Sequence, residues 1–530
     1  MIDKNLNTLD KIYQSFVSNA NPDDIIMYFN ESQISVQMYI EGVDSYVRHL
    51  INLGVKSGEA VGYSMPNCPE VFCLFTAIAR IGACAVPLFH MIPDAAKADI
   101  FRKSRVQIAV VSSKQYDSFK EASEKAVSPY RIVTIDKGSV CQYSFESSID
   151  NIDLDKALAN GISPDLPLII ASSSGTTGVP KLVAMSQSNV ASEVYAAIDL
   201  ITPIDSDCIT RYRNSIAFPL STAGIITVIG MIFVNIPIIF SQDISPIRFL
   251  QLMSMWKSQG LSAPPAYFEG ILSLPMLDSF DLTSVKAIAG GMDFIFPSLV
   301  RRMKEKFINI RYFANGYGLI ETSNVFMVCK QTVEDGYDKP TSMMRICRGT
   351  SNSIEVRGED GNLVPLGCEG ELYVRGSNVV KGYLNNPNES ESSFSDGWFK
   401  TGDIVRNEGE GLITLLGRRK YLIKRGGKSI SPIFVQDYLN KIEGVENSAV
   451  VGVPHQLYGE MIWAFIVVKN GFRLDLKDIM KHVRKELPNY MVPDQISFID
   501  QIPKNSGVGK VDSEKLKEMA LIELTNTYGG

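Results

Sequence analysis

The sequence predicts an α/β protein of two domains, and three observations support this prediction. The chain has 530 residues, too many for one hydrophobic core. From about residue 35 to 430, short apolar runs of strand length alternate with longer segments of helical period. Near Gly417 this pattern restarts. We expect a large N-terminal domain, residues 1–417, of two α/β sheet subdomains plus a small β-barrel-like piece, and a small α+β C-terminal domain, residues 418–530, on a hinge.

The N-terminal elements follow from apolar runs and their punctuation. Two glycine-bounded strands, at 370–376 and 411–418, indicate the β-rich piece. The expected strand–helix pairs are Ala60–Met65 before Cys68–Gly82 and Ile108–Ser112 before Ser118–Lys125, with a further strand at Leu168–Ser172.

The C-terminal elements form a separate series after a short junction at 417–421. The brevity of this junction predicts a tight hinge instead of a floating linker. The series comprises strands at Lys420–Lys424, Ala449–Val453 and Trp463–Lys469 and helices at Pro432–Ile442 and Leu476–Leu487.

Residues 224–240 are apolar for 17 residues, near the lower limit for a membrane span. Asn235 and Pro237 interrupt the run, so we expect a buried helix leading into a buried strand and no membrane span. The N-terminus has acidic residues and no apolar signal core, which indicates a cytoplasmic protein.

Charge and cysteine usage argue against a nucleic-acid-binding protein and against a cysteine-ligated metal site. The net charge is −6 and no Lys/Arg block stands out, so no nucleic-acid partner is expected. The segment from Arg418 onward holds 17 Lys/Arg against 13 Asp/Glu, which suits an anionic partner or simply solvated helix faces. The 8 cysteines show no metal-ligand spacing, and most read as small core residues.

The strongest chemical signal is the string from Ser172 to Lys181, SSSGTTGVPK, directly after the apolar run LPLIIA. Glycines allow close backbone approach, and hydroxyls, amides and one lysine supply donors for polyphosphate. The string is not a P-loop, because Pro180 precedes the lysine and Leu182 follows it.

This string resembles the phosphate loop of the adenylate-forming superfamily of AMP-dependent synthetases and ligases: acyl- and aryl-CoA synthetases, peptide-synthetase adenylation domains and beetle luciferases. Further motifs follow in the family's order over roughly residues 25–520. They are Tyr317-Gly-Leu-Ile-Glu321, Trp398-Phe-Lys-Thr-Gly-Asp403, Gly417-Arg418 running to Gly426-Gly427, and Pro503-Lys-Asn-Ser-Gly-Val-Gly-Lys510.

The resemblance implies ATP/AMP-binding roles. Asp403 would accept hydrogen bonds from the ribose hydroxyls, and Arg418 would support the ribose or phosphate. Tyr317 would flank the adenine, with Gly290 and Gly291 lining the base slot. The other implied nucleotide-binding residues are Ser174, Gly175, Thr177, Gly178, Lys181 and Gly318.

The implied catalytic residues are Lys510, Glu321 and Thr176. Glu321 would hold Mg²⁺ with the phosphates of ATP. Lys510 would contact the substrate carboxylate and the α-phosphate as the acid attacks phosphorus. The family's threonine before Glu321 is Ile320 here, and Thr322 is a candidate substitute.

Substrate choice is implied to lie between about Arg213 and Thr322. Pro219 stands where amino-acid-activating relatives have an aspartate, so an α-amino acid is disfavoured. Small and apolar residues suit an aryl or medium acyl acid. The acyl pocket is expected from Phe218, Ser221, Gly224, Gly316 and Leu319.

The resemblance further implies transfer of the acyl group to a thiol. The acceptor is coenzyme A or the 4′-phosphopantetheine of a carrier protein in trans, since no carrier motif follows Lys510. Gly426 and Gly427 would line the thiol tunnel, and Tyr421 would be the hinge. Two alternatives remain at this point: an adenylate-forming enzyme that makes no thioester, and a non-catalytic nucleotide-binding homologue.

Overall fold

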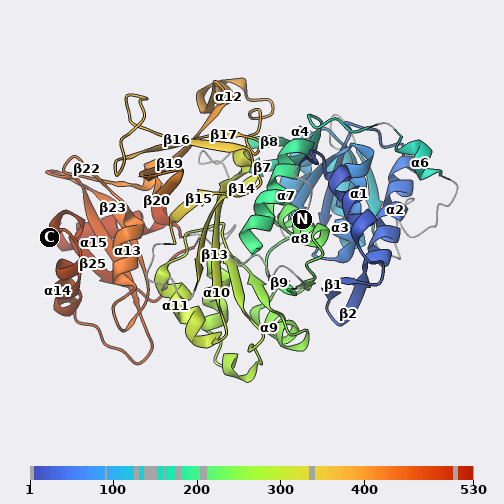
Figure 1. Cartoon of the computed structure of the whole chain (residues 1–530). Coiled ribbons are helices and arrows are strands. Elements are labelled where there is room, and N and C mark those ends of the chain that lie inside the picture. The colour runs from blue at the N-terminus through green and yellow to red at the C-terminus, as the bar shows by residue number, and fades with distance from the viewer. Residues whose placement is uncertain are drawn as a thin grey trace.

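The computed structural model describes residues 5–89, 92–124, 130–135, 152–159, 161–173, 181–202, 212–332, 341–504 and 511–528. Figure 1 shows a large N-terminal domain, blue to yellow-orange, beside a small C-terminal domain in orange and red. The predicted α/β fold of two unequal domains is confirmed. The helices are α1 (Leu9–Asn19), α2 (Val36–Asn52), α3 (Pro69–Ile81), α4 (Asp94–Lys103), α5 (Tyr116–Glu124), α6 (Leu154–Ala157), α7 (Gln187–Ile201), α8 (Thr222–Phe233), α9 (Pro246–Met255), α10 (Pro265–Leu272), α11 (Pro297–Lys306), α12 (Pro387–Ser393), α13 (Pro432–Leu439), α14 (Leu476–Glu486) and α15 (Ser513–Tyr528).

The first sheet of the N-terminal domain is six-stranded and parallel except at one edge, where β8 runs against β7. Its central strands β3, β4 and β5 are buried along almost their whole length, as is usual for parallel strands covered on both faces. In spatial order they are β6 (Arg131–Thr134), β5 (Val106–Val111), β3 (Ala60–Met65), β4 (Cys84–Phe89), β7 (Pro167–Ser173) and β8 (Lys181–Ser186).

The second sheet has 14 strands, parallel from β1 to β13 along this order and antiparallel beyond. Its antiparallel part is the predicted β-rich piece, which is hydrogen-bonded to the α/β part. In spatial order the strands are β16 (Asn352–Arg357), β17 (Glu369–Gly376), β19 (Trp398–Gly409), β20 (Leu412–Arg418), β15 (Met343–Ile346), β14 (Asn324–Thr332), β13 (Tyr312–Leu319), β12 (Ala287–Gly290), β11 (Gly260–Ser262), β9 (Asn214–Ile216), β10 (Ile238–Phe240), β1 (Ile25–Phe29) and β2 (Ser32–Ser35), with β18 (Phe394–Ser395) paired to β19.

One hydrophobic core joins the two sheets of the N-terminal domain. It takes residues from α1, α2, α3, α7 and α8 and from strands of both sheets. The apolar run at 224–240 forms α8 and then β10, as predicted, and its isoleucines are buried in this core. No helix in the described part of the chain has the length and apolar character needed to span a bilayer.

The C-terminal domain packs helices on an antiparallel sheet, with one parallel pairing at its edge. The predicted strand at Lys420–Lys424 begins later than expected. A 3-10 turn occupies Arg419–Tyr421, and Leu422 packs against Ile404 and Leu416 of the N-terminal domain. The strand therefore begins only at Ile423. The strands are β22 (Lys428–Ile430), β21 (Ile423–Arg425), β24 (Gly459–Val468), β23 (Val445–His455) and β25 (Gln495–Phe498).

Candidate active site

A carboxylate, a guanidinium and a phenol meet where β19 pairs with β20, and we call Tyr317, Asp403 and Arg418 the aspartate cluster. Asp403 lies opposite Arg418 in the ladder. The Arg418 Nε is 2.9 Å from Asp403 Oδ1, and the Tyr317 hydroxyl donates to Oδ2 at 2.6 Å. Asp403 is only 4% exposed. The tertiary structure thus brings together three residues that lie in separate sequence motifs.

The hydroxyl of Tyr317 is held as a donor. Burial raises its pKa well above the ordinary value, and the charge of Asp403 raises it further. The ring centroid of Tyr317 lies 5.4 Å from that of Phe326, so the side chain is fixed at its ring and at its tip. The aspartate cluster is therefore assembled in advance of any ligand.

A second polar group, which we call the glutamate cluster, contains Lys181, Glu321, Tyr383 and Glu389. The Tyr383 hydroxyl donates to Glu321 Oε1 at 2.8 Å. The Lys181 Nζ lies 4.9 Å from the centroid of the Tyr383 ring and forms an ion pair with Glu389 on α12. Burial raises the pKa of Tyr383, and the carboxylate of Glu321 adds to that rise.

The glutamate cluster fits a magnesium ion that shares its ligands with a substrate. In the described part of the chain, Tyr383 engages one oxygen of Glu321, and the other has no partner there. No group of three or more His, Cys, Asp or Glu side chains among the described residues forms a metal cage. Mg²⁺ is commonly held by one or two carboxylates plus phosphate oxygens, and this donor set matches that pattern.

An apolar cavity of about 180 Å³ lies at the carboxyl ends of the parallel strands of the second sheet. No described lining residue carries a charge. The set includes Phe218, Gly224, Gly316 and Leu319, predicted for the acyl pocket, and also Gly290, Gly291 and Gly318, predicted for nucleotide binding. The lining residues are Leu200, Ile201, Phe218, Gly224, Thr227, Ser262, Ala263, Pro264, Ala289, Gly290, Gly291, Met292, Gly316, Gly318, Leu319, Ile320, Asn324 and Val325.

Packing requires glycine at two positions of this wall, Gly318 and Gly224. A Cβ on Gly318 would lie 1.4 Å from the carbonyl oxygen of Asn324, and one on Gly224 would lie 2.3 Å from that of Pro219. Gly316 is less confined, because an added Cβ would meet Leu200 and Val325 side chains at 3.1 and 3.2 Å. A larger residue at Gly316 would therefore reduce the cavity without a backbone clash.

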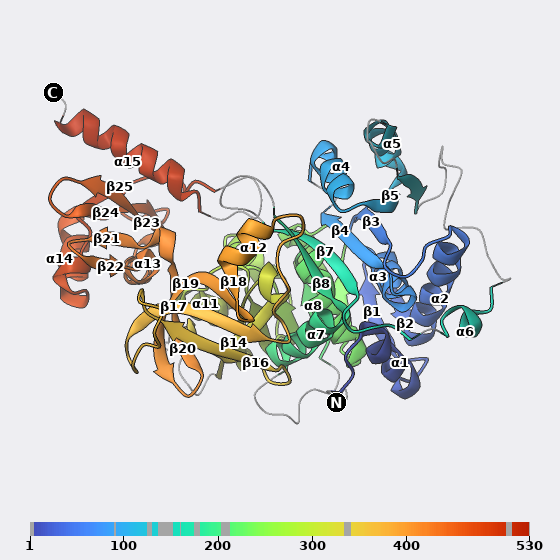
Figure 2. The same ribbon diagram turned by 90° about the horizontal axis from the view of Figure 1, so that it is seen from above.

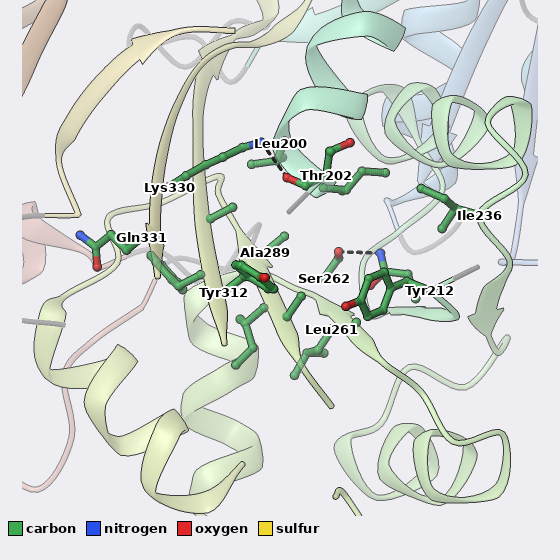
Figure 3. A pocket seen from close by; sticks show the side chains of 17 residues that line it. Leu200, Thr202, Tyr212, Ile236, Leu261, Ser262, Ala289, Tyr312, Lys330 and Gln331 are labelled. Atoms are coloured by element: carbon green, nitrogen blue, oxygen red, sulfur yellow. Dashed lines mark hydrogen bonds between the residues drawn. The ribbon is translucent and has the colours of Figure 1, made fainter. Parts of the chain in front are cut away.

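A smaller cavity of about 40 Å³ lies next to the first and shares Leu200, Ile201, Ser262 and Ala289 with it. Figure 3 shows it between α7 and the strands of the second sheet. Two of its polar side chains are paired: the Asn214 side-chain amide donates to Ser262 at 2.9 Å, and the Lys330 Nζ donates to the Thr202 carbonyl at 2.7 Å. The space left for a ligand is therefore mostly apolar.

The structure places two further hydroxyl residues from the predictions. Ser221 is not among the described residues that line the cavity; it occupies the N-cap position of α8, where its carbonyl accepts from the Ile225 N–H, and its part in the acyl pocket stays a prediction. Thr322 does not replace the missing threonine at Ile320. Its side chain is fully buried and its hydroxyl bonds the backbone at Leu319 and Asn324, so it serves the turn.

Six predicted residues fall outside the described part of the chain. Strands β7 and β8, which flank the predicted phosphate loop, are antiparallel neighbours with Ser173 opposite Lys181. Lys504 and Val511, on either side of the predicted lysine loop, pair as an isolated bridge. The six residues are Ser174, Gly175, Thr176, Thr177, Gly178 and Lys510.

The predicted hinge and glycine pair lie at the domain junction and beyond it. Tyr421 ends the 3-10 turn and is 45% exposed. Gly426 and Gly427 have φ of +55° and +77° and join β21 to β22, a conformation that favours glycine. Figure 2 shows the start of α15, which follows the predicted lysine loop, on the side facing the N-terminal domain.

Sequence reasoning missed Tyr383 and Glu389. Both follow β17 in a segment rich in turn residues, where no apolar period or charged motif marks them. The signal for Tyr383 is weak: one aromatic residue after Gly382, followed by Asn385, Asn386 and Pro387. Only the pairing of this segment with β8 places the tyrosine beside Lys181.

The fold is that of adenylate-forming enzymes. The chain matches the family model described as AMP-binding enzyme over residues 16–384 and the one described as AMP-binding enzyme C-terminal domain over residues 435–510. It therefore belongs to the AMP-binding enzyme family.

Similar curated proteins carry CoA-ligase names. Indoleacetate–CoA ligase of Aromatoleum aromaticum is 26% identical over 513 residues, covering 95% of this chain and 96% of that protein. 4-Coumarate–CoA ligase 1 of Petroselinum crispum is 25% identical over 88% of this chain and 86% of that protein.

Solved structures support the fold. The amide bond synthetase McbA from Marinactinospora thermotolerans superposes with a TM-score of 0.83 at 21% identity, covering 96% of this chain and 99% of that chain. The anthranilate CoA ligase AuaEII with anthranoyl-AMP gives a TM-score of 0.82 at 19% identity, covering 98% of both chains.

Proposed function

We propose that this protein activates a carboxylic acid with ATP and then transfers the acyl group to a thiol. In the first step a carboxylate oxygen attacks the α-phosphorus, the bond to pyrophosphate breaks, and an acyl-AMP forms. In the second step a thiol sulfur attacks the acyl carbon and AMP leaves. The domain division at 417/418, with a pivot at Tyr421, would let the C-terminal domain serve both steps in turn.

One observation supports this proposal above the others: a single segment joins the polar clusters to the apolar cavity. Gly316, Gly318, Leu319 and Ile320 line the cavity. Between and after them, Tyr317 contacts Asp403 and Glu321 contacts Tyr383. An acid bound in the cavity would thus have its carboxylate beside the nucleotide-binding groups, which is the placement that adenylation requires.

The nucleotide would be held by the two polar clusters. Asp403 would accept hydrogen bonds from the ribose hydroxyls, with Arg418 and Tyr317 keeping its carboxylate in place. Glu321 would ligate a magnesium ion that bridges the phosphates, and Lys181 would contact the same phosphates. Lys510 would stabilise the charge that develops at the α-phosphate.

The substrate we propose is an aryl or medium acyl acid without an α-amino group. The cavity of about 180 Å³ has no charged lining residue to pair an ammonium, and an unpaired buried charge is costly. An engineered apolar cavity of about 150 Å³ in another protein binds benzene, so this one has room for an aromatic ring. The relatives named for indoleacetate and 4-coumarate are consistent with this size.

The acceptor we propose is coenzyme A or the pantetheine arm of a separate carrier protein. A panel of carboxylic acids in ATP–pyrophosphate exchange, repeated with coenzyme A and followed by mass spectrometry, tests the whole proposal. Exchange with an aryl or medium acyl acid and formation of its CoA thioester are expected. Exchange without thioester formation would point to a carrier protein or to an enzyme that stops at the adenylate. An α-amino acid exceeding its des-amino analogue would overturn the substrate proposal.

A further inference from the structure

Tyr383 lies beside two charged side chains that come from distant parts of the chain. Its segment pairs with the edge strand β8, through a bridge between Val183 and Tyr383 and a 2.7 Å bond from the Leu384 N–H to the Leu182 carbonyl. Its own N–H donates to Ser390 at 2.9 Å, which fixes the segment to α12. The backbone around Tyr383 is thus held on both sides.

The side chain of Tyr383 makes a separate contact at each of its two ends. The hydroxyl donates to Glu321 Oε1 at 2.8 Å, and one ring face lies 4.9 Å from the Lys181 ammonium. The Phe394 ring packs edge-on against it, with centroids 5.6 Å apart and planes at 73°. The hydroxyl also has a hydrogen bond with the Ser393 side chain. A tyrosine that only filled space would not need a carboxylate and an ammonium among its polar neighbours.

We propose that Tyr383 is a positioning residue of the ATP site: its hydroxyl orients the Glu321 carboxylate toward magnesium, and its ring face orients Lys181 toward the phosphates. This inference rests on the proposed function. One oxygen of Glu321 is engaged by the phenol, and the other would be the one to ligate a cation. The Lys181 side chain is 18% exposed and is restrained by Tyr383 and by Glu389. Restraining both groups before ATP binds reduces the entropy lost on binding.

Two substitutions separate the two contacts. Tyr383→Phe removes the hydroxyl and keeps the ring, whereas Tyr383→Leu removes both. Tyr267→Phe is the matched control, because the Tyr267 hydroxyl also donates a partly buried hydrogen bond, to the Ile244 carbonyl at 2.7 Å, but contacts neither cluster. All three are compared with wild type by the ATP-induced rise in melting temperature, with Mg²⁺ titrated and with Mg²⁺ removed by a chelator.

For Tyr383→Phe we expect a roughly tenfold higher Mg²⁺ concentration for the half-maximal temperature rise, since a bond to a charged group is lost. The ATP concentration for half-maximal effect without metal should be unchanged. In Tyr383→Leu the half-maximal ATP concentration without metal should rise as well, by about threefold, because the cation–π contact with Lys181 is lost. Tyr267→Phe should lower the melting temperature of the free protein and change neither ligand response.

Three results would overturn the role of Tyr383 while leaving the proposed function intact: a wild-type Mg²⁺ response in Tyr383→Phe, an equal loss with and without metal, or the same response in Tyr383→Leu as in Tyr267→Phe. The proposed function fails in a different way. In that case the wild-type protein itself shows no ATP-induced stabilisation and no pyrophosphate exchange with any acid.

Discussion

The two ends of the candidate active site are built by opposite means. At the nucleotide end, charged side chains hold one another: both oxygens of Asp403 are already engaged, by Arg418 and Tyr317. At the acyl end the described walls carry no charge, and the space exists because residues such as Gly316 and Ala289 are small. The nucleotide end is therefore defined by polar contacts that one substitution can remove, and the acyl end by a volume that one substitution can fill.

The largest effect is expected from a residue outside this comparison. Lys510→Ala should reduce acyl-AMP formation about 10²- to 10³-fold, by analogy with loss of one oxyanion donor, because charge at the α-phosphate loses its partner. Pyrophosphate exchange with the best acid measures it. Lys504→Ala, in the same segment and exposed, is the control and should retain wild-type exchange. Wild-type exchange in Lys510→Ala would refute the assignment.

A change at the junction should separate the two half-reactions. Tyr421→Pro fixes φ near about −65° and removes one backbone donor. We expect substantial pyrophosphate exchange but loss of most thioester synthesis, with acyl-AMP left bound. Equal losses in both steps would place the pivot elsewhere, and a thermal melt would reveal whether the proline unfolds the junction instead.

Removing a polar contact at the nucleotide end should raise the KM for ATP and leave the preference among acids unchanged. Asp403→Ala removes the partner of Arg418 and Tyr317, and we expect the KM for ATP to rise roughly 10- to 100-fold, as for lost hydrogen bonds to a charged group. Asp165→Ala removes an exposed aspartate that pairs with Lys381, and should leave this KM unchanged. A shift in the ranking of acids by Asp403→Ala would mean that the two ends are not independent.

Filling the acyl end should do the reverse. Gly316→Val places methyl groups against Leu200 and Val325, and we expect preference to move roughly 10- to 100-fold toward smaller acids. The KM for ATP, measured with the smallest active acid, is the internal control and should stay within about twofold of wild type. An unchanged ranking of acids would show that this cavity does not hold the acyl group.

The smallest effect on activity is expected at Asp199, which belongs to neither polar cluster and is not a lining residue of the acyl cavity. Burial would raise the pKa of Asp199, but bonds from Arg345, Lys330 and the Arg348 N–H outweigh it and lower that pKa to about 2. Since the folded pKa is depressed, the stabilisation is present above about pH 4 and is lost as the pH falls toward about 2. Asp199→Asn should lower the free energy of unfolding at pH 7 by about 2 kcal/mol.

Urea unfolding between pH 2 and 7 measures this effect of Asp199. In the Asp199→Asn variant, the fall in stability between about pH 4 and 2 should be shallower than in wild type. An identical fall in both proteins would show that other carboxylates account for it. ATP–pyrophosphate exchange at neutral pH should be nearly unchanged, because Asp199 contacts neither polar cluster.

The sequence by itself determined the elements and the chemical types. Strand–helix alternation predicted β3 with α3 and β5 with α5. Such elements can be predicted because the spacing of apolar residues within one element reflects which of its faces is buried. Asn235 and Pro237 separated a buried helix from a membrane span. The ordered motifs identified Asp403, Arg418, Glu321 and Lys181 as one chemical set before any geometry was known.

Tertiary structure alone decided which side chains meet. The contact of Tyr317 with Asp403 spans 86 positions and that of Tyr383 with Glu321 spans 62, and no local pattern encodes such a distance. The same holds for Thr322, the candidate substitute for the threonine missing at Ile320, because its hydroxyl donates to the backbone carbonyls of Leu319 and Asn324 instead. The period of apolar residues predicts which face of a single helix or strand is buried. The active site forms where the order of strands in the sheet brings elements from distant parts of the sequence side by side.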